Sequence, residues 1–389
     1  MIGDLFSARR RRWGEVDWHI LLIAISLLGF GLAFLFAMSE SLSSRNKDPI
    51  RFAGHVQKLV LTLPLLAAGL FLRPEWLRRN SHWIYLATIL LLMAVPIIGD
   101  ERNNARRWIQ LPFFDLQPSE LAKLGVILML AKVLKENALQ RLEDWVAPSF
   151  LLALPMGLVA LQPDLGTAMT MVPVGLGMFY IAGARMKIIT ALVAFGALLG
   201  FVAVKGEVVH GYQLQRIETW MGSWTHEGLV AQKNRAGFHV YHARTAIGNG
   251  GLEGRGLGQG VANEAGFLPE RDSASVFAVI AEESGFLGTM GLLFLYVLLV
   301  LLLMQSAAAQ RDRFSRLAVG GVSLYFASHL FINTSVNLGI LPMTGLTLPL
   351  FSTGGSSLMA TFLALGIALG LAADHPPTFT GRGSVRGLP

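Results

Sequence analysis

Residues 317–373 read LAVGGVSLYFASHLFINTSVNLGILPMTGLTLPLFSTGGSSLMATFLALGIALGLAA, a run of 57 residues without a formal charge. A helix crosses ~30 Å of hydrocarbon with ~20 residues, so the run is far too long for one membrane span. The Gly, Pro and Asn residues that a turn would use gather in its middle, between Asn333 and Ser357. This stretch therefore predicts two membrane helices joined by a long turn.

The composition of the whole chain points the same way. Of its 389 residues, 53% are hydrophobic and only 15% are charged, which is far from the composition of ordinary soluble domains. Further uncharged runs of spanning length are residues 20–39, 145–163, 165–184 and 284–310. We expect an all-α, polytopic membrane protein that forms one integral domain over residues 1–389. The absence of cysteine excludes disulfides, thiolate metal sites and cysteine catalysis.

Ten membrane helices are expected from these runs and from shorter or partly charged ones. Their approximate bounds are 18–38, 56–73, 82–99, 117–134, 146–162, 165–183, 187–204, 276–305, 316–337 and 355–373. A long polar loop, residues 205–275, separates the seventh helix from the eighth, and a tail of residues 374–389 follows the tenth.

Basic residues predict the orientation of these helices. An even number of spans places both termini on the same side of the membrane. With that side cytoplasmic, inside segments hold 17 of the 32 Lys and Arg residues and the short outside loops hold six, in line with the preference of cations for the cytoplasmic face. The cluster Arg9–Arg12 precedes the first helix without an obvious cleavage site, so we expect that helix to be retained. The chain is predicted to lie in the inner (cytoplasmic) membrane with both termini inside.

This topology brings four segments to the outer face of the membrane. They are residues 100–119, 162–167, 205–275 and 333–357. A site assembled from them would face the periplasm or the cell exterior, where no ATP is available. The glycine-rich stretch 248–258 is therefore interpreted as a flexible turn and not as a nucleotide-binding loop.

Two charged residues lie within the fourth predicted helix. Glu120 and Lys123 are three residues apart, so they share one helical face. Charges at membrane depth are costly and usually face a bundle interior or a wet cavity. The pair is interpreted either as an internal ion pair that locks two helices, or as part of a cavity in which Lys123 attracts an anionic head group.

Further candidates lie at the outer ends of the helices. Asp164 sits in a hairpin with almost no loop, where it would either cap the helix that starts at Leu165, worth ~1 kcal/mol, or act in catalysis. Arginines form either a solvated charge run or a phosphate clamp, because guanidinium groups bind phosphate oxygens bidentately. They are Arg102, Arg106, Arg107, Arg216, Arg244 and Arg255.

Other kinds of chemistry find little support in the sequence. The loop 205–275 contains four histidines, but none is spaced as a helical ligand pair around an acid, so no dedicated metal site is predicted and a divalent cation stays an open question. No Gly-x-Ser-x-Gly motif indicates a serine hydrolase. No feature predicts a nucleic-acid partner.

Seven motifs occur in an order that resembles one family. They are QPSELAK (117–123), QPDLGT (162–167), YQLQRI (212–217), AIGNGGL (246–252), FLPER (267–271), FAVIAEE (277–283) and the pair NLGILP (337–342) and PLFSTGGSS (349–357). On these residues nearly the whole chain resembles the SEDS family of shape, elongation, division and sporulation proteins, which includes RodA, FtsW and SpoVE. The form Phe-Leu-Pro-Glu-Arg is more similar to the RodA elongation branch than to the FtsW division branch.

The resemblance implies a ten-helix peptidoglycan glycosyltransferase that polymerises lipid II outside the cytoplasmic membrane. Its expected partner is a class B penicillin-binding protein, the transpeptidase of an elongation or division complex. In such an enzyme an aspartate deprotonates the 4-hydroxyl of the acceptor sugar, this oxygen attacks the anomeric carbon of the donor, and undecaprenyl pyrophosphate leaves. The residues expected to bind substrate or pyrophosphate are Lys123, Glu120, Arg106, Arg107, Asp164, Arg216, Arg244 and Ser356.

The chain departs from the family where that aspartate is expected. Aligned without a gap on Phe277, the family pattern places Ala274 at the aspartate and Asp272 two residues before it. Three hypotheses remain: Asp272 is a shifted catalytic base, Glu270 or a water relay serves instead, or the chain is a catalytically altered paralogue that acts as a binding or scaffold partner of a transpeptidase. Thr353, in place of a tyrosine, is a further departure. Flipping of lipid-linked precursors is a minor alternative, because the hydropathy pattern contains no inverted repeat.

Overall fold

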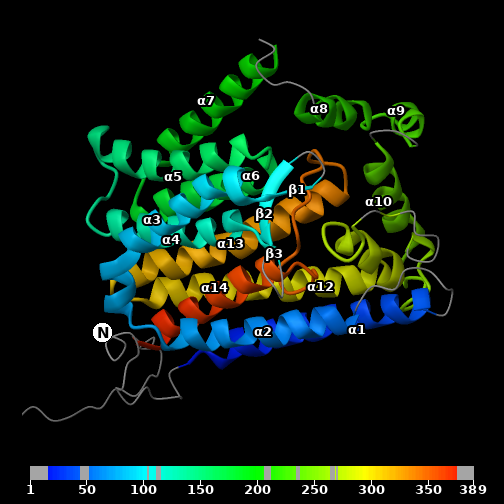
Figure 1. Ribbon diagram of the computed structural model, residues 1–389, viewed down its shortest axis with the longest axis horizontal. Helices are drawn as coiled ribbons and strands as arrows, with labels where there is room; N and C mark the ends of the chain where they lie inside the picture. Colours follow the sequence, from blue (N-terminus) through cyan, green and yellow to red (C-terminus); the bar gives the residue numbers. More distant parts are fainter. Residues whose placement is uncertain are drawn as a thin grey trace, which may run out of the picture.

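The computed structural model describes residues 16–43, 52–102, 105–110, 115–205, 212–233, 237–262, 268 and 270–374 (Figure 1). The cluster Arg9–Arg12 and all but the first residue of the predicted tail 374–389 lie outside these residues. A helix coincides with each predicted span. These helices are α1 (Trp18–Ser43), α2 (Phe52–Phe71), α3 (Pro74–Ile98), α4 (Pro118–Leu134), α5 (Glu143–Leu161), α6 (Leu165–Ala182), α7 (Met186–Lys205), α12 (Val276–Ala309), α13 (Arg313–Asn337) and α14 (Gly355–Asp374).

Eight helices of the described ranges are long and apolar enough to cross a membrane. The other two are α7 and α4, of which α4 has 17 residues and carries Glu120, Lys123 and Lys132. The prediction of a polytopic helical membrane protein is therefore confirmed. The exact number of ten spans stays a prediction.

Local sequence signals explain where several helices begin and end. The carboxylate of Asp164 accepts a hydrogen bond from the backbone N–H of Thr167 at 3.2 Å and so caps α6, which is one of the two roles considered for it above. Asp312 caps α13 in the same way, through the N–H of Ser315 at 3.0 Å. α6 ends at Gly183, whose φ of 110° is in the left-handed region that glycine adopts without strain.

Two regions contain structure that the hydropathy pattern does not predict. Residues after α3 form a three-stranded antiparallel sheet in the order β1 (Asp100–Arg102), β2 (Ala105–Gln110) and β3 (Asp115–Leu116). The long polar loop contains three short helices, α8 (Tyr212–Gly222), α9 (His226–Ala231) and α10 (Phe238–Asn249). The loop is therefore largely folded in the part that the structure describes.

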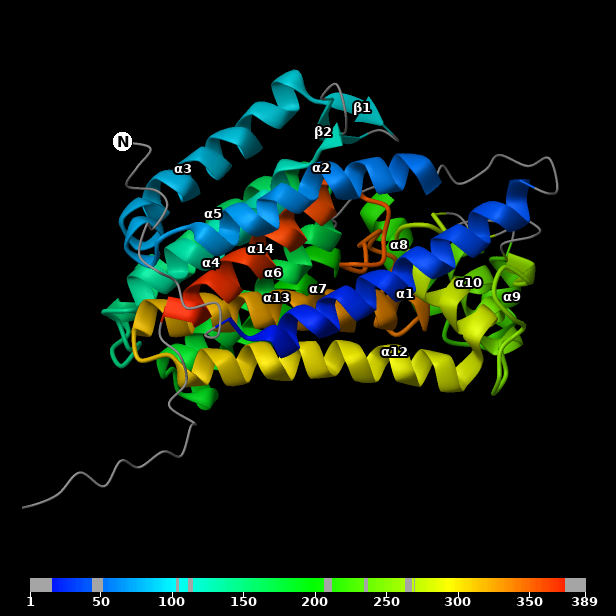
Figure 2. The same cartoon turned by 90° about the horizontal axis from the view of Figure 1, so that it is seen from below.

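The bundle is built from closely packed helix pairs. α14 packs along α2, α13 lies against α12 and α6, and α3 lies along α4 (Figures 1 and 2). Glycine permits the closest of these approaches: a Cβ on Gly366 of α14 would collide with the carbonyl oxygen of Leu66 in α2. Close backbone contact through small residues is the usual way in which membrane helices associate, because lipid gives no hydrophobic drive to their pairing.

The glycine-rich stretch 248–258, interpreted above as a flexible turn, is instead fixed against α12. Its backbone N–H groups at Arg255 and Gly256 donate to the carbonyls of Glu282 and Glu283 at 3.0 and 2.9 Å. In return the N–H of Phe286 donates to the carbonyl of Gly251 at 2.9 Å. α12 breaks between these contacts, at Gly285. The segment thus satisfies backbone groups that the broken helix leaves open.

We expect substitution of Gly285 by alanine to destabilise the fold. Gly285 has φ 66° and ψ −168°, a combination that only glycine adopts readily, so a side chain there costs at least ~1–3 kcal/mol. Its Cβ would also collide with the backbone of Gly254. Thermal unfolding of the purified protein in detergent checks this. Gly291→Ala in the same helix is the matched control, since a Cβ there meets open space, and equal melting of the two variants would contradict the expectation.

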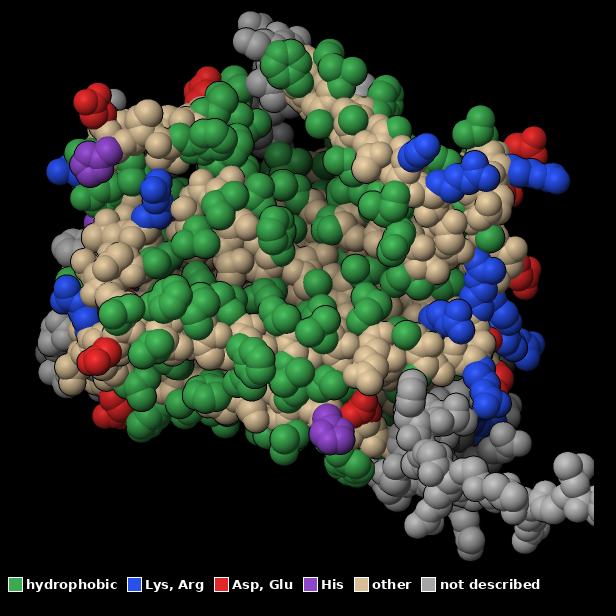
Figure 3. All heavy atoms as spheres, turned by 180° about the vertical axis from the view of Figure 1, so that it is seen from behind, with side chains coloured by type: hydrophobic (Ala, Val, Ile, Leu, Met, Phe, Trp, Pro, Cys, Tyr) green, Lys and Arg blue, Asp and Glu red, His purple; other side chains and the backbone are tan. Residues whose placement is uncertain are grey.

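The surface of the molecule fits a lipid environment. On the face opposite that of Figure 1, hydrophobic side chains cover a broad band, and Lys and Arg are most numerous towards one end (Figure 3). Exposed apolar residues on the helices include Phe30, Leu90, Phe195 and Phe294, each more than half exposed. Such a continuous apolar surface is stable only where lipid covers it.

Candidate active site

A cavity of about 530 Å³ opens at the end of the bundle where α4, α6 and α14 begin. All four segments predicted to share the outer face contribute to its lining. Arg107, Asp115 and Gln117 come from the first segment and Asp164 and Thr167 from the second. The long loop supplies Arg216, Glu270 and Ser273, and the turn between α13 and α14 supplies Thr344–Thr347 and Thr353–Ser357.

Three helix N-termini meet at this cavity. Glu120 lies in the first turn of α4, Thr167 in that of α6, and Ser356 in that of α14. Each helix N-terminus carries about half a positive elementary charge and a set of backbone N–H donors without helical partners. Three of them around one space make a site that favours an anion.

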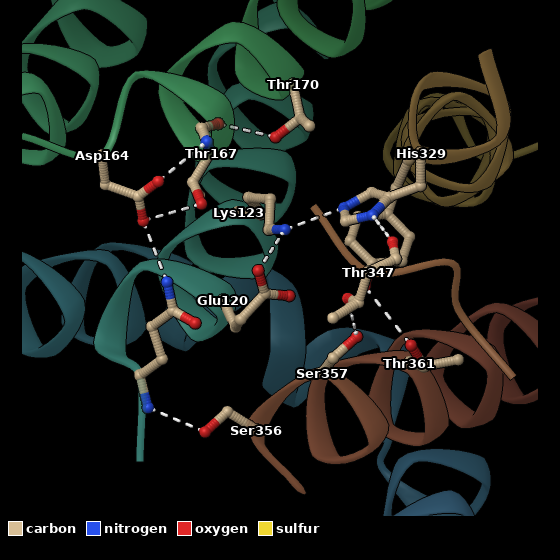
Figure 4. Close-up of polar contacts among 12 residues, drawn as sticks. Glu120, Lys123, Asp164, Thr167, Thr170, His329, Thr347, Ser356, Ser357 and Thr361 are labelled. Carbon is tan, nitrogen blue, oxygen red and sulfur yellow. Dashed lines mark hydrogen bonds and ion pairs between the residues drawn. The ribbon is translucent and has the colours of Figure 1, made fainter. Parts of the chain in front are cut away.

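Hydrogen bonds from Gln117 and Thr167 hold these three N-termini together. Gln117 donates from its side chain to the carboxylate of Asp164 at 2.9 Å, and its backbone N–H donates to the hydroxyl of Ser356 at 2.8 Å (Figure 4). The hydroxyl of Thr167 also donates to Asp164, at 2.9 Å. Asp164 is therefore a cap and a structural link at the cavity wall, which is the structural role that its position predicts.

Three cationic side chains line the cavity: Lys58, Arg107 and Arg216. The guanidinium of Arg107 donates to the carbonyls of Gln162, at 3.1 Å, and of Pro163, which fixes its position beside α6. Lys58 lies on α2 and reaches the carbonyl of Thr353 at 3.5 Å. The sequence prediction missed Lys58, although a lysine inside an apolar span is itself a signal of a polar cavity.

Lys123 is not among the residues that line the cavity. Its ammonium is buried, 2.7 Å from the carboxylate of Glu120 and 2.8 Å from Nε2 of His329 on α13 (Figure 4). The ring of Tyr325 lies 5.2 Å away. Of the two interpretations offered for this pair, the geometry fits the ion pair that locks α4 onto α13. Of the two residues of this pair, only Glu120 borders the cavity. Its second carboxylate oxygen is buried and has no hydrogen-bond partner among the described residues.

Glu270 is the acid of the FLPER segment that lies in the cavity. Burial raises the pKa of its carboxyl group, and the negative charge of Asp272 raises it further. Arg216, a hydrogen bond from Ser273, and Arg107 act in the opposite direction and lower the pKa. Glu270 also has a φ of 48°, which is unusual for a residue with a side chain. A carboxylate with a raised pKa in a cavity is a typical proton acceptor.

Asp272 does not belong to the cavity lining. Its Oδ2 accepts a hydrogen bond from the hydroxyl of Thr353 at 2.9 Å, and the backbone N–H of Thr353 donates to its carbonyl at 3.0 Å. Ala274 is buried, and its carbonyl accepts from the side-chain amides of Asn333 and Asn337 at 2.9 and 3.1 Å. These contacts fix the chain on either side of Ser273, the residue between them that reaches the cavity.

Three of the predicted arginines, Arg106, Arg244 and Arg255, lie away from the cavity lining. Arg106 donates to the carboxylate of Glu101 at 3.3 Å and is half exposed. Arg244 donates to the carbonyl of Ser223 at 3.1 Å and so connects α10 to the end of α8. Arg106 and Arg107 are consecutive residues of strand β2, and consecutive strand residues point to opposite faces. The composition of the segment does not show which of the two faces the cavity.

The described residues offer no ready ligand set for a metal ion. No group of three or more His, Asp or Glu side chains within the described ranges is arranged to hold a metal ion. The question of a divalent cation stays open.

The fold and the cavity define a polytopic helical membrane protein with a charged site at one end of its bundle, lined by three basic and four acidic side chains. Residues 18–375 match the cell cycle protein family of FtsW, RodA and SpoVE. The chain belongs to this family.

Named relatives come from both branches of the family. The chain is 36% identical to the probable peptidoglycan glycosyltransferase FtsW of Thiomicrospira cyclica, over 91% of each chain. It is 31% identical to the peptidoglycan glycosyltransferase MrdB of Escherichia coli K12, over 92% of this chain and 94% of that one. The preference for the elongation branch therefore stays a prediction.

Solved structures share the whole fold. A chain of a peptidoglycan synthase complex that coordinates polymerization and crosslinking has a TM-score of 0.78 and 31% identity, over 93% of this chain and 99% of that one. The rod shape determining protein RodA of Thermus thermophilus has a TM-score of 0.69 and 31% identity, over 93% of this chain and 98% of that one.

Proposed function

We propose that this chain is a peptidoglycan glycosyltransferase that polymerises lipid II at the outer face of the cytoplasmic membrane. The observation that carries the proposal is the cavity, where three helix N-termini and the cations Lys58, Arg107 and Arg216 surround one space. The pyrophosphate of a lipid-linked sugar is an anion that suits this arrangement. The named activity of relatives from both branches supports the same reaction.

Glu270 is the carboxylate best placed to accept the proton in this reaction. It would take the proton from the 4-hydroxyl of the acceptor sugar as that oxygen attacks the anomeric carbon of the donor. The bond from this carbon to the pyrophosphate oxygen breaks, and undecaprenyl pyrophosphate leaves with the bonding electrons. The cations and helix N-termini stabilise the negative charge that develops on the leaving group. Asp272, the first candidate from the sequence, acts in this scheme through its charge on Glu270.

The membrane orientation and the partner belong to the same proposal. Both termini lie in the cytoplasm and the cavity opens outward, as the distribution of Lys and Arg in the sequence predicts. A class B penicillin-binding protein would crosslink the strands that this chain makes, within an elongation or division complex. The similarity to a chain of a complex that combines polymerization and crosslinking supports such a partner.

A polymerisation assay tests the proposal. The purified protein, with its cognate class B penicillin-binding protein, is given labelled lipid II, and we expect glycan strands from the wild type. The matched variant is Ala274→Asp, which restores the aspartate of the family pattern. No polymer from the wild type but polymer from Ala274→Asp would overturn the proposal and identify a silent paralogue.

The pH dependence of polymerisation should follow the carboxyl group of Glu270. A base works when it is deprotonated, so activity should fall as the pH decreases through a pKa above the ordinary glutamate value. Arg216 lowers this pKa, so Arg216→Gln should move the acidic limb of the pH–rate profile to higher pH. Rates at each pH, measured at saturating lipid II, check the shift. An acidic limb that stays in place would contradict the role of Glu270.

A further inference from the structure

An apolar patch lies where the folded loop meets the turn after α13, and none of its residues lines the cavity. It consists of Trp220, Met221, Trp224, Leu338 and Ile340, and we call it the interfacial patch. Met221 and Trp224 are 55% and 67% exposed, and Leu338 and Ile340 are 42% and 57% exposed. The indole N–H of Trp220 donates to the carbonyl of Ile340 at 3.1 Å, which joins α8 to the turn after α13. The rings of Trp220 and Trp224 meet edge to face at 5.0 Å.

α8 itself is amphipathic. Leu214, Ile217 and Met221 follow one another at positions i, i+3 and i+7, so they form one apolar stripe beside Trp220. Gln215 and Glu218 are exposed on the adjoining face. A short helix with this pattern, bordered by tryptophan, is typical of a segment that lies flat at a membrane–water interface.

The position of the patch in the fold indicates what covers it. α13, one of the candidate membrane spans, ends at Asn337, and Leu338 and Ile340 follow at once. The patch therefore begins at the depth where a spanning helix leaves the hydrocarbon. α8 and α9 lie clear of the helix bundle, on the side where α7 extends away from it (Figure 1). Tryptophan, which borders α8, is enriched at the membrane–water interface of membrane proteins.

We infer that the interfacial patch inserts into the head-group–acyl boundary of the leaflet on the cavity side and holds α8 flat on the membrane. Arg216 lies on this same helix and lines the cavity. The mouth of the cavity is therefore held at head-group level. One consequence rests on the proposed function: a lipid-linked head group enters the cavity directly from the bilayer.

The absence of cysteine from the chain gives a direct depth measurement. Met221→Cys and Trp224→Cys, each labelled with a fluorophore in the full-length protein in phosphatidylcholine nanodiscs, are quenched by lipids with a nitroxide at a shallow or a deep acyl position. A probe ~5–10 Å inside the boundary should be quenched about twofold more strongly by the shallow nitroxide. Phe195→Cys, 57% exposed within α7, is the deep control, and Gln215→Cys on the polar face of α8 is the water-side control.

Quenching of neither patch position by either lipid would overturn the inference, since the patch would then face water or another protein. Quenching as strong at Gln215→Cys as at Met221→Cys would also overturn it, because α8 would not be oriented by its apolar stripe. The measurement needs no substrate and no activity. A failed depth measurement with normal lipid II polymerisation would therefore remove the inference and leave the proposed function in place.

Discussion

Replacing Glu270 by glutamine should reduce lipid II polymerisation by ~10²- to 10⁴-fold, the usual contribution of a positioned general base. Glutamine keeps the size of the side chain but cannot accept the proton of the acceptor hydroxyl. The loss should appear in kcat, because the cations proposed to bind pyrophosphate remain in place. Initial rates of strand formation from labelled lipid II, together with lipid II binding to the variant, separate the two effects.

Asp272→Asn is the matched control for this variant. Asp272 lies outside the cavity lining and is bonded to Thr353, so its amide analogue should keep most of the maximal rate. It should move the acidic limb of the profile to lower pH, because the charge of Asp272 raises the pKa of Glu270. An inactive Asp272→Asn beside an active Glu270→Gln would reverse the assignment and make Asp272 the shifted base.

Replacing Lys123 by methionine should destabilise the fold by ~3–5 kcal/mol, the usual cost of removing one partner from a buried ion pair. The variant leaves the carboxylate of Glu120 in a buried position without its cation, and Nε2 of His329 loses its neighbour at 2.8 Å. Thermal unfolding in detergent, followed by tryptophan fluorescence, measures the loss. The α4–α13 contact is the part of the fold expected to loosen.

The double variant Glu120→Gln with Lys123→Met is the control for this experiment. Because the amide carries no charge, the double variant should recover most of the stability that Lys123→Met loses. A single variant that melts like the wild type would show that the pair does not lock the two helices. A double variant less stable than Lys123→Met would point to a hydrogen-bonding role of Glu120 beyond the ion pair.

Long apolar runs made most of the fold predictable. The prediction of helices at 165–183 and 276–305 differs from α6 and α12 by only a few residues at the C-terminal ends. Length and hydropathy suffice for such helices, since a membrane imposes them locally. The strands at 100–116 and the helices α8–α10 are short and lack an apolar run of spanning length, so the hydropathy of the sequence does not predict them.

The candidate site was predictable as a set of segments but not as a set of contacts. The topology placed four segments on one face, and residues from all four line the cavity. Lys123 was expected among the cations of the site, yet its ammonium is held by Glu120 and His329. Lys58 takes its place in the lining. Sequence position gives the helix on which a charge lies, whereas the rotation and packing of that helix decide which space the charge faces.

The sequence by itself determined the class of protein, the positions of the long helices and the family, because each depends on local hydropathy or on the order of motifs. For the proton acceptor it left three hypotheses: Asp272, Glu270 or a water relay, and a paralogue with altered catalysis. Only the tertiary structure shows which of the two acids lines the cavity. Thr353, 81 residues further along the chain, bonds the carboxylate of Asp272, while Glu270 lines the cavity together with Arg216 and Arg107. A contact so distant in sequence forms only when the turn before α14 folds back against the start of α12.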